Sequence, residues 1–492
     1  MITGGNRMDY IVTGYTWFFK NILWLNILFA ILLVFFERRN PTTTWLWLMV
    51  LTFLPGIGFL LYLFIGQDMS KKRMFQQKEV DDRIIRDKVM RQGEKIFQER
   101  YDYSNPKFME HEDIIKMHIL TSEAYFSQDN EVEMYFDGEE KFEAFLESIK
   151  KAKNYIYIEY YIIKSDGIGV KIIDALTEKA KEGVEVKVLY DGMGGRKLKI
   201  RAFDKFKKAG GEVAVFFPPF APFFTLRINY RNHRKLCIID GKEAYVGGFN
   251  IGDEYLGLSK RFGYWRDSHI KIKGTAVAAL QWQFYKDWRF AAHKDNAHCE
   301  LGIPMQETRG NVGIQIVSSG PDSKWPSVKD GYFKIITNAK ERIYIQSPYF
   351  IPDDSMLEAL RVAGLSGLDV KVMIPCKPDH PFVYWAGMSY IGELLEAGVK
   401  FYTYENGFLH SKLFVMDDFI TSIGTANLDI RSFKLNFEVN AFIYDEEVTS
   451  ETIEQFHKDL EYCKEITLEE YGRRSNIVKL KESVSRLLSP IL

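Results

Sequence analysis

Two histidines in this chain begin the same spaced pattern of chemically active residues. Each is followed by a lysine, an aspartate and an asparagine at identical offsets. The first pattern consists of His233, Lys235, Asp240 and Asn250, and the second of His410, Lys412, Asp417 and Asn427. With Lys and Asp each at roughly one position in fifteen, only about one histidine in two hundred would show the His, Lys and Asp spacing by chance. We therefore treat the duplication as functional.

Both patterns are predicted to lie on β-hairpins. In each one a short apolar run, residues 235–239 or 412–416, ends at Asp-Gly or Asp-Asp and is followed by a second apolar run. This order is typical of two strands joined by a tight turn. Residues two positions apart in a strand point to the same face, so each hairpin should present an imidazole beside an ammonium group. The asparagine and the small residues before it then follow the second strand, where a ligand can approach the backbone closely.

These residue types suit phosphoryl transfer. One imidazole can attack phosphorus and form a covalent intermediate, while the other protonates the leaving oxygen. Two lysines and two asparagines can neutralise and hydrogen-bond the phosphoryl oxygens as charge develops. This chemistry needs no metal and no other cofactor, and we predict none. A single histidine on a strand is more often a buried structural residue, but repetition of the whole pattern argues against that interpretation.

The paired patterns resemble the HKD motifs of the phospholipase D superfamily. The run Asn229-Tyr-Arg-Asn-His-Arg-Lys235 and the apolar N-terminal segments further resemble bacterial cardiolipin synthases, over nearly the whole chain. The resemblance implies phosphatidyl transfer between two phosphatidylglycerol molecules, which gives cardiolipin and glycerol through a phosphatidyl-histidine intermediate. It implies His233 as the nucleophile and His410 as general acid and then general base. A phospholipase D-type hydrolase or another headgroup-exchange enzyme is the first alternative, and a membrane-tethered phosphodiesterase or nuclease is a distant one.

The resemblance groups the His, Lys and Asp of both motifs as catalytic. Asp240 and Asp417 end a strand at a turn, however, so a structural role that braces the hairpin or the lysine is left open. Asn250 and Asn427 are expected to bind phosphate. Arg231 and Arg234 beside the first histidine, and Arg431 after the second motif, are candidates for a second phosphate or for ordinary surface positions.

An active imidazole needs an acceptor at its other nitrogen, because that acceptor fixes the tautomer. In the enzymes that this chain resembles, a carboxylate on the strand after the second motif orients the motif histidine. We therefore expect Glu438 to orient His410. By analogy, Asp267 is the expected partner of His233.

The two motifs belong to two copies of a longer repeat. Residues 149–159 are similar to residues 336–346, and each copy alternates three helices with three strands before its hairpin. This alternation is typical of an α/β layered sandwich. The family resemblance implies two phospholipase D-like α/β/α sandwiches that form an intrachain pseudo-dimer with one shared site. We expect the repeats at residues 121–300 and 301–492, the second including C-terminal helices.

A two-helix transmembrane hairpin is predicted at residues 1–66. Its spans are expected at about residues 11–36 and 45–65, which are largely apolar and long enough to cross a bilayer. A cleaved signal peptide would be shorter and single. Lys and Arg are more frequent in the flanks than in the connecting loop, so the catalytic domain is expected on the cytoplasmic side of the cell membrane. A charged helical connector follows at residues 67–120.

The first copy carries an apolar insertion before its motif. Residues 216–227 are rich in Phe and Pro and therefore cannot form a regular central strand. An exposed apolar loop needs a partner, so we interpret it as a membrane-contacting or acyl-binding wall with Phe223 and Phe224 as lipid contacts. The alternative is an internal plug beneath the second copy.

The charge balance argues against a nucleic-acid partner. The formal net charge is −1, so the chain lacks the general basic field that nucleic-acid binding requires. The expected partners are phosphatidylglycerol and cardiolipin in the membrane, and the sequence does not define the oligomeric state. Residues 475–488 are predicted to form an amphipathic, basic helix that either covers the fold, which we favour, or lies on the membrane.

Overall fold

The computed structural model describes most of the chain beyond its N-terminal segment. It covers residues 83–199, 201–218, 230–292, 310–377 and 379–489, with short stretches between residues 21 and 62. The chain divides into two compact units, one with residues 1–79 and 221–229 and one with residues 80–220 and 230–492.

The smaller unit contains α2 (Pro41–Phe53). Within the described stretches, no helix has both the length and the apolar character required to cross a bilayer. Most of the span expected at residues 11–36 lies outside the described residues, whereas most of the span expected at residues 45–65 is described.

The first half of the larger unit alternates helices and strands as predicted. Asp137 and Asp166 cap α8 and α9 by accepting hydrogen bonds from free backbone N–H groups of the first turn. The elements of this half are β1 (Phe126–Tyr135), α8 (Gly138–Lys151), β2 (Tyr155–Tyr160), α9 (Gly167–Lys181), β3 (Glu185–Asp191), α10 (Asp204–Lys208), β4 (Glu212–Phe216), β5 (Arg231–Asn232), β6 (Lys235–Ile239), β7 (Glu243–Gly247), β8 (Trp265–Arg266), β9 (His269–Lys273) and α11 (Ala276–Ala292).

The second half repeats this order and adds helices at its end. Asp353 and Asp445 cap α13 and α16 in the same way. Its elements are β10 (Val312–Ser319), α12 (Ser327–Asn338), β11 (Arg342–Gln346), β12 (Phe350–Ile351), α13 (Asp354–Leu365), β13 (Asp369–Pro375), α14 (Pro381–Glu396), β14 (Lys400–Tyr404), β15 (Phe408–Leu409), β16 (Leu413–Met416), β17 (Ile420–Gly424), β18 (Leu428–Asp429), α15 (Ile430–Lys434), β19 (Asn436–Tyr444), α16 (Glu446–Leu460), β20 (Cys463–Ile466), α17 (Leu468–Gly472) and α18 (Asn476–Leu487).

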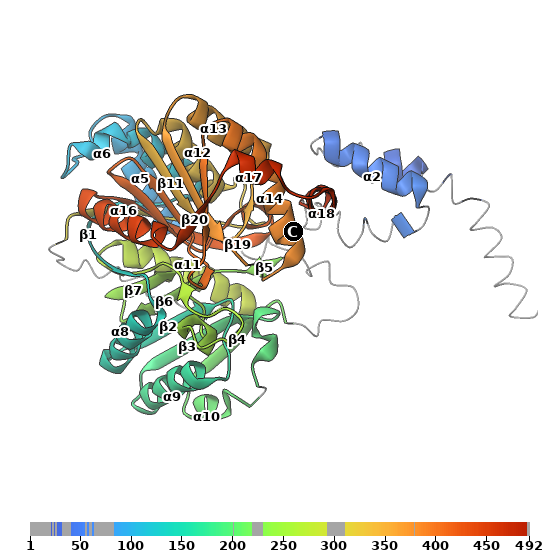
Figure 1. The fold of residues 1–492 in the computed structure, drawn as a ribbon. Helices are drawn as coiled ribbons and strands as arrows, with labels where there is room; N and C mark the ends of the chain where they lie inside the picture. The colour runs from blue at the N-terminus through green and yellow to red at the C-terminus, as the bar shows by residue number, and fades with distance from the viewer. Residues whose placement is uncertain are drawn as a thin grey trace, which may run out of the picture. The chain divides into compact units, whose positions relative to one another are not determined.

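Both halves contribute to one continuous sheet of 16 strands (Figure 1). The order is β4-β3-β2-β6-β7-β9-β1 in the first half and β10-β19-β17-β16-β11-β13-β14-β20 in the second, with β5 paired to β19. The halves meet where β1 pairs antiparallel with β10, with Phe126 opposite Gln315. The predicted fold of two α/β repeats packed as a pseudo-dimer is therefore confirmed.

Helices cover both faces of the sheet, because alternating side chains of the central strands pack against helices on opposite faces. In the first half, Ile156 and Ile158 join the core beneath α8 and α9, whereas Tyr157 stacks on Phe284 of α11 with ring centroids 5.0 Å apart. In the second half, Tyr344 stacks in the same way on Phe456 of α16, at 4.8 Å. Each half is thus an α/β/α sandwich.

The segment predicted as a charged connector also contributes to the core. It contains α5 (Arg83–Phe97), α6 (Lys107–Glu110) and α7 (Glu112–Ser122). Val89 and Ile96 of α5 and Ile115 of α7 are buried in the apolar cluster of the second half, so these helices extend its helix layer.

Candidate active site

The two motifs lie on the hairpins that the sequence predicts. Strands β6 and β7 pair antiparallel, as do β16 and β17, and each motif histidine lies just before the first strand of its hairpin. Each hairpin lies in the interior of its half of the sheet, where its apolar residues are buried on both faces. The strands therefore hold the motif residues on rigid backbone.

A two-residue strand before each motif crosses to the opposite half. Strand β5 pairs in parallel with β19, and β15 pairs in parallel with β8. The backbone N–H of His233 donates to the carbonyl of Phe437 at 2.9 Å, and that of His410 donates to the carbonyl of Arg266 at 2.7 Å. Each histidine is consequently anchored to a strand of the other repeat.

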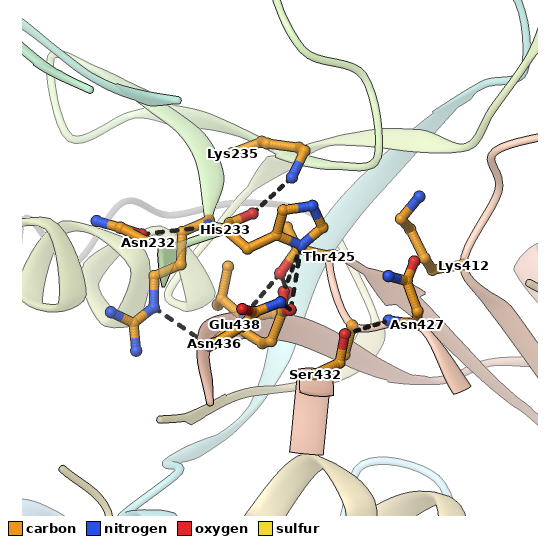
Figure 2. A network of polar contacts seen from close by, with 12 residues as sticks. Asn232, His233, Lys235, Lys412, Thr425, Asn427, Ser432, Asn436 and Glu438 are labelled. Atoms are coloured by element: carbon orange, nitrogen blue, oxygen red, sulfur yellow. Dashed lines mark hydrogen bonds and ion pairs between the residues drawn. The ribbon is translucent and has the colours of Figure 1, made fainter. Parts of the chain in front are cut away.

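This crossing determines which carboxylate holds which imidazole. Nδ1 of His233 lies 3.0 Å and 3.1 Å from the two carboxylate oxygens of Glu438 (Figure 2). Nδ1 of His410 lies 2.6 Å from Oδ2 of Asp267. The predicted carboxylates are thus the right ones, but the predicted pairing of Glu438 with His410 and of Asp267 with His233 is wrong. Each carboxylate follows the hairpin of its own repeat and reaches the histidine of the other.

Both histidine–carboxylate pairs are buried, and burial is the largest influence on the pKa of the two histidines. It lowers the pKa of His233 to about 4, with Lys235 and Lys412 adding to the effect and Glu438 opposing it. Burial also lowers the pKa of His410. Lys412 adds to this shift, whereas the carboxylate of Asp267 opposes it. Each histidine side chain keeps a little exposed surface, 12% for His233 and 11% for His410. Because Nδ1 is engaged in both, Nε2 of each neutral ring is the nitrogen available to a ligand.

The two motif lysines complete a compact charged centre. Lys235 and Lys412 are almost fully buried, and the ammonium of each donates to the backbone carbonyl of the histidine two residues before it, at 2.6 Å for Lys235. Burial lowers the pKa of Lys235 to about 7 and that of Lys412 to about 8, while Asp267 and Glu438 oppose this shift. An anionic phosphate entering between them would favour the charged form of both lysines.

The motif aspartates lie at the far ends of the hairpins. Asp240 accepts hydrogen bonds from the backbone N–H groups of Lys153, Asn154 and Tyr155 at 2.7–2.9 Å. Asp417 accepts equivalent bonds from the backbone of residues 340–342. Both aspartates have a positive φ, 53° and 50°, which a tight turn requires. Their carboxylates therefore brace the turn, and the structure does not place them with the catalytic group to which the resemblance assigned them.

The two motif asparagines have different surroundings. Oδ1 of Asn250 accepts from the backbone N–H of Ile162 at 3.0 Å, which ties the motif loop to the end of β2. The amide of Asn427 donates to Asp429 at 3.3 Å, and its Oδ1 is buried without a hydrogen-bond partner among the described residues. The Nδ2 group of Asn427, which could donate to a phosphoryl oxygen, is thus engaged with Asp429, and phosphate binding by either asparagine stays a prediction.

The small residues before these asparagines differ for a steric reason. A Cβ at Gly248 would lie 1.8 Å from Oδ1 of Asp267, so the first repeat requires glycine there. At the equivalent position the second repeat has Thr425, whose hydroxyl hydrogen-bonds the backbone of Val439. This hydroxyl also helps to lower the pKa of Glu438, though less than His233 does.

One of the candidate arginines is neither a phosphate ligand nor a surface residue. Arg234 is buried and forms an ion pair with Asp287 at 2.6 Å. Arg266, which also belongs to the first repeat, forms a buried pair with Asp459 of the second repeat, at 2.7 Å. These guanidinium groups neutralise aspartates of α11 and α16 and are not available to a headgroup.

A tyrosine that the sequence did not single out lies against the first histidine. The ring of Tyr161 is edge-on to His233 with centroids 5.1 Å apart, and Lys235 lies 5.7 Å from the tyrosine ring. Burial raises the pKa of Tyr161, and Arg231, Arg431 and Arg196 act in the opposite direction. The available signal was its place just after β2, because ligands of α/β folds bind at the carboxyl ends of parallel strands.

Other expected features lie wholly or partly beyond this site. Phe216 and Phe217 are buried against Phe290 and Phe437, but residues 219–229, with Phe223 and Phe224, lie outside the described residues. Within the ranges that the structure describes, no three His, Cys, Asp or Glu side chains come together as a metal-binding group.

The duplicated fold and the crossed histidine pairs define a protein of the phospholipase D superfamily. A family model described as cardiolipin synthase, phospholipase D-like domain, matches residues 145–288 and 332–460, and one described as phospholipase D-nuclease N-terminal matches residues 24–67. The chain belongs to this family of cardiolipin synthases.

Similar proteins agree with this assignment. The major cardiolipin synthase ClsA of Bacillus subtilis (strain 168) is 51% identical over 469 residues, which cover 95% of this chain and 97% of the relative. The cardiolipin synthase of Listeria monocytogenes serotype 4b is 50% identical over 473 residues, covering 96% and 98%. The crystal structure of phosphatidylserine synthase from Haemophilus influenzae Rd KW20 matches with a TM-score of 0.59 at 15% identity, covering 77% of this chain and 100% of that one, and supports the fold alone.

Proposed function

We propose that this protein synthesises cardiolipin by transferring a phosphatidyl group from one phosphatidylglycerol to another. The observation that carries the proposal is the pair of buried imidazoles, each held at Nδ1 by a carboxylate of the opposite repeat and each beside a buried lysine. Two imidazoles with free Nε2 atoms supply the nucleophile and the acid that phosphodiester exchange requires. The names of the relatives support phosphatidylglycerol as donor and acceptor.

In the first step Nε2 of His233 attacks phosphorus and forms the P–N bond. The P–O bond to glycerol breaks, and His410 donates its proton to the glycerol oxygen. Both histidines are neutral at rest, and the anionic substrate favours the protonated form of His410. In the second step neutral His410 takes the proton of the acceptor hydroxyl, whose oxygen attacks phosphorus and displaces His233. Lys235 and Lys412 stabilise the developing negative charge in both steps.

The membrane arrangement belongs to the same proposal. Residues 1–66 form a two-span hairpin in the cell membrane, residues 67–120 connect it to the repeats at 121–300 and 301–492, and the catalytic domain faces the cytoplasm. The match of residues 24–67 to a family N-terminal model supports this anchor. Phosphatidylglycerol and cardiolipin are then the membrane partners, and Phe223 and Phe224 contact lipid.

A product assay tests the proposal. Purified protein is incubated with labelled phosphatidylglycerol in the presence of a chelator, beside the His233→Ala and His410→Ala variants. His457→Ala, which removes an exposed imidazole on α16, is the matched control. We expect equimolar cardiolipin and glycerol from the wild type and the control, and neither product from the two motif variants. Phosphatidic acid as the only lipid product would make the protein a hydrolase instead.

A further inference from the structure

Helix α18 packs against the protein through polar residues. The residues that pack inward are Val478, Glu482 and Ser485, followed by Ser489 just beyond the helix. Glu482 is 4% exposed and binds Arg474 at 2.6 Å, and the hydroxyl of Ser489 lies 3.0 Å from that of Tyr390 on α14. This inward face is therefore mainly polar.

The opposite face of α18 is apolar and exposed. It carries Ile477, Leu480, Val484 and Leu487, with exposed fractions of 68%, 64%, 49% and 80%. Their spacing of three and four residues places them in one stripe along the helix. A surface helix of a soluble domain normally buries such a stripe against the core. Here the orientation is reversed, so the stripe requires an apolar partner outside this domain.

Charged residues on both sides of the stripe indicate the chemistry of that partner. Lys479, Lys481 and Arg486 flank it, and no acidic residue of α18 is exposed, because its only one, Glu482, is buried. Lys481 lies 4.9 Å from the ring of Trp385, and Arg486 lies 4.3 Å from that of Tyr390. An apolar stripe with cationic flanks is the pattern of helices that lie in the interface of an anionic bilayer.

The position of α18 relates this surface to the active site. The helix packs along α14, whose first turn follows Asp379 and carries Phe382, which is 52% exposed. Asp379 accepts a hydrogen bond from Tyr349 and is one of the carboxylates that raise the pKa of Lys412. Helix α14, on which α18 packs, therefore begins beside the charged centre formed by the motif lysines.

We propose that α18 lies in the surface of an anionic bilayer, with Ile477, Leu480, Val484 and Leu487 among the acyl chains and the basic flanks on the headgroups. This contact goes beyond the proposed reaction, because it is a second attachment that does not require the N-terminal segment. It holds the domain against the bilayer from which the substrate must enter.

Photocrosslinking of the full chain in phosphatidylglycerol-containing proteoliposomes tests where the stripe lies. Benzoylphenylalanine replaces Leu487, and in a matched control it replaces Leu365, which is 63% exposed on α13. We expect lipid adducts from position 487 and none from position 365. Adducts to residues 1–66 of the same chain, or to a second copy, would overturn the proposal.

Kinetics supply the second readout. The variant Ile477→Ser/Leu480→Ser/Val484→Ser/Leu487→Ser should lose roughly tenfold or more of its activity on vesicles. On a water-soluble short-chain phosphatidylglycerol it should retain wild-type activity. Val362→Ser/Leu365→Ser is the control and should retain both. Equal loss on both substrates, or no loss on vesicles, would contradict the proposal. Absence of wild-type turnover on either lipid would count against the proposed function, whereas the crosslinks would still report the position of α18.

Discussion

The crossed pairing of carboxylates and histidines makes a prediction that distinguishes it from pairing within each repeat. Glu438→Gln keeps the size of the side chain but removes the charge beside His233, and Asp267→Asn does the same beside His410. In each variant the chemical defect should match the loss of the histidine in the other repeat.

The size of the effect follows from the contact. Glu438 is fully buried and contacts Nδ1 of His233 with both oxygens. At an effective dielectric of about 20, opposite unit charges about 4 Å apart attract by about 4 kcal/mol. This attraction stabilises the positive charge that develops on the ring, and at 1.36 kcal/mol per decade its loss slows the reaction roughly a thousandfold. An amide can also hold the wrong tautomer, which raises the expected loss towards about ten thousandfold.

Single-turnover assays with two leaving groups identify the partners. A nitrophenyl phosphodiester of diacylglycerol needs no general acid, because nitrophenolate leaves without a proton. If His410 is the acid, the His410→Ala and Asp267→Asn variants should recover much of their rate on this substrate, whereas His233→Ala and Glu438→Gln should be slow on both substrates. If His233 is the acid, the two groups exchange, but each carboxylate still follows the histidine of the other repeat.

Two further measurements make this test decisive. In the His233→Ala background, Glu438→Gln should cause little additional loss, since residues that act as a unit are not additive. Glu159→Gln is the matched control, because Glu159 is another fully buried carboxyl of the first repeat, and burial and Asp287 raise its pKa well above the usual value. If Glu438→Gln instead behaved like His410→Ala, the crossed arrangement would be refuted.

Three further predictions concern the surroundings of the site. Gly248→Thr should displace Asp267 and reduce turnover at least roughly a hundredfold, whereas Thr425→Gly should lose under about tenfold; similar rates for the two variants would contradict the steric argument. Asp240→Ala should lower the melting temperature, because three backbone N–H groups lose their acceptor, yet turnover per folded molecule should stay within about twofold. Burial lowers the pKa of Lys141 from 10.5 to about 7, so its destabilising effect is full below pH 7 and disappears as the pH rises from about 7 to 10.5. Lys141→Met should therefore raise the melting temperature at pH 7 and abolish this part of the pH dependence, and an unchanged profile would disprove the assignment.

The sequence contains the local part of this site but not its long-range connections. The hairpins, the alternation of helices and strands and the duplication were predictable, because they depend on short-range patterns and turn residues. The identities of Glu438 and Asp267 were also predictable, because the family resemblance implies a carboxylate after the second hairpin and the repeat suggests its counterpart after the first. Their partners were not, since these depend on β5 and β15, two-residue strands that pair across the halves.

The same limit explains why the sequence did not define the role of Arg234. Arg234 lies beside a motif histidine, and nothing in its neighbourhood along the chain indicates that Asp287, on a distant helix, will neutralise it. Similarly, the exposed stripe of α18 was visible as amphipathicity. Which face would turn inward depended on Glu482 and Arg474.

The crossed histidine pairs depend on the β1–β10 pairing that joins the two halves. Neither repeat can assemble a complete imidazole–carboxylate pair from its own residues. A half that folds correctly alone is therefore expected to be catalytically inactive. Turnover therefore depends on the docking of the two halves. A substitution that weakens the β1–β10 pairing, even far from the active site, would separate both histidines from their carboxylates and abolish activity. Two inactive chains, one damaged in each half, could regain activity only if their intact halves dock on each other. The architecture thus prevents an incompletely assembled domain from cleaving lipid.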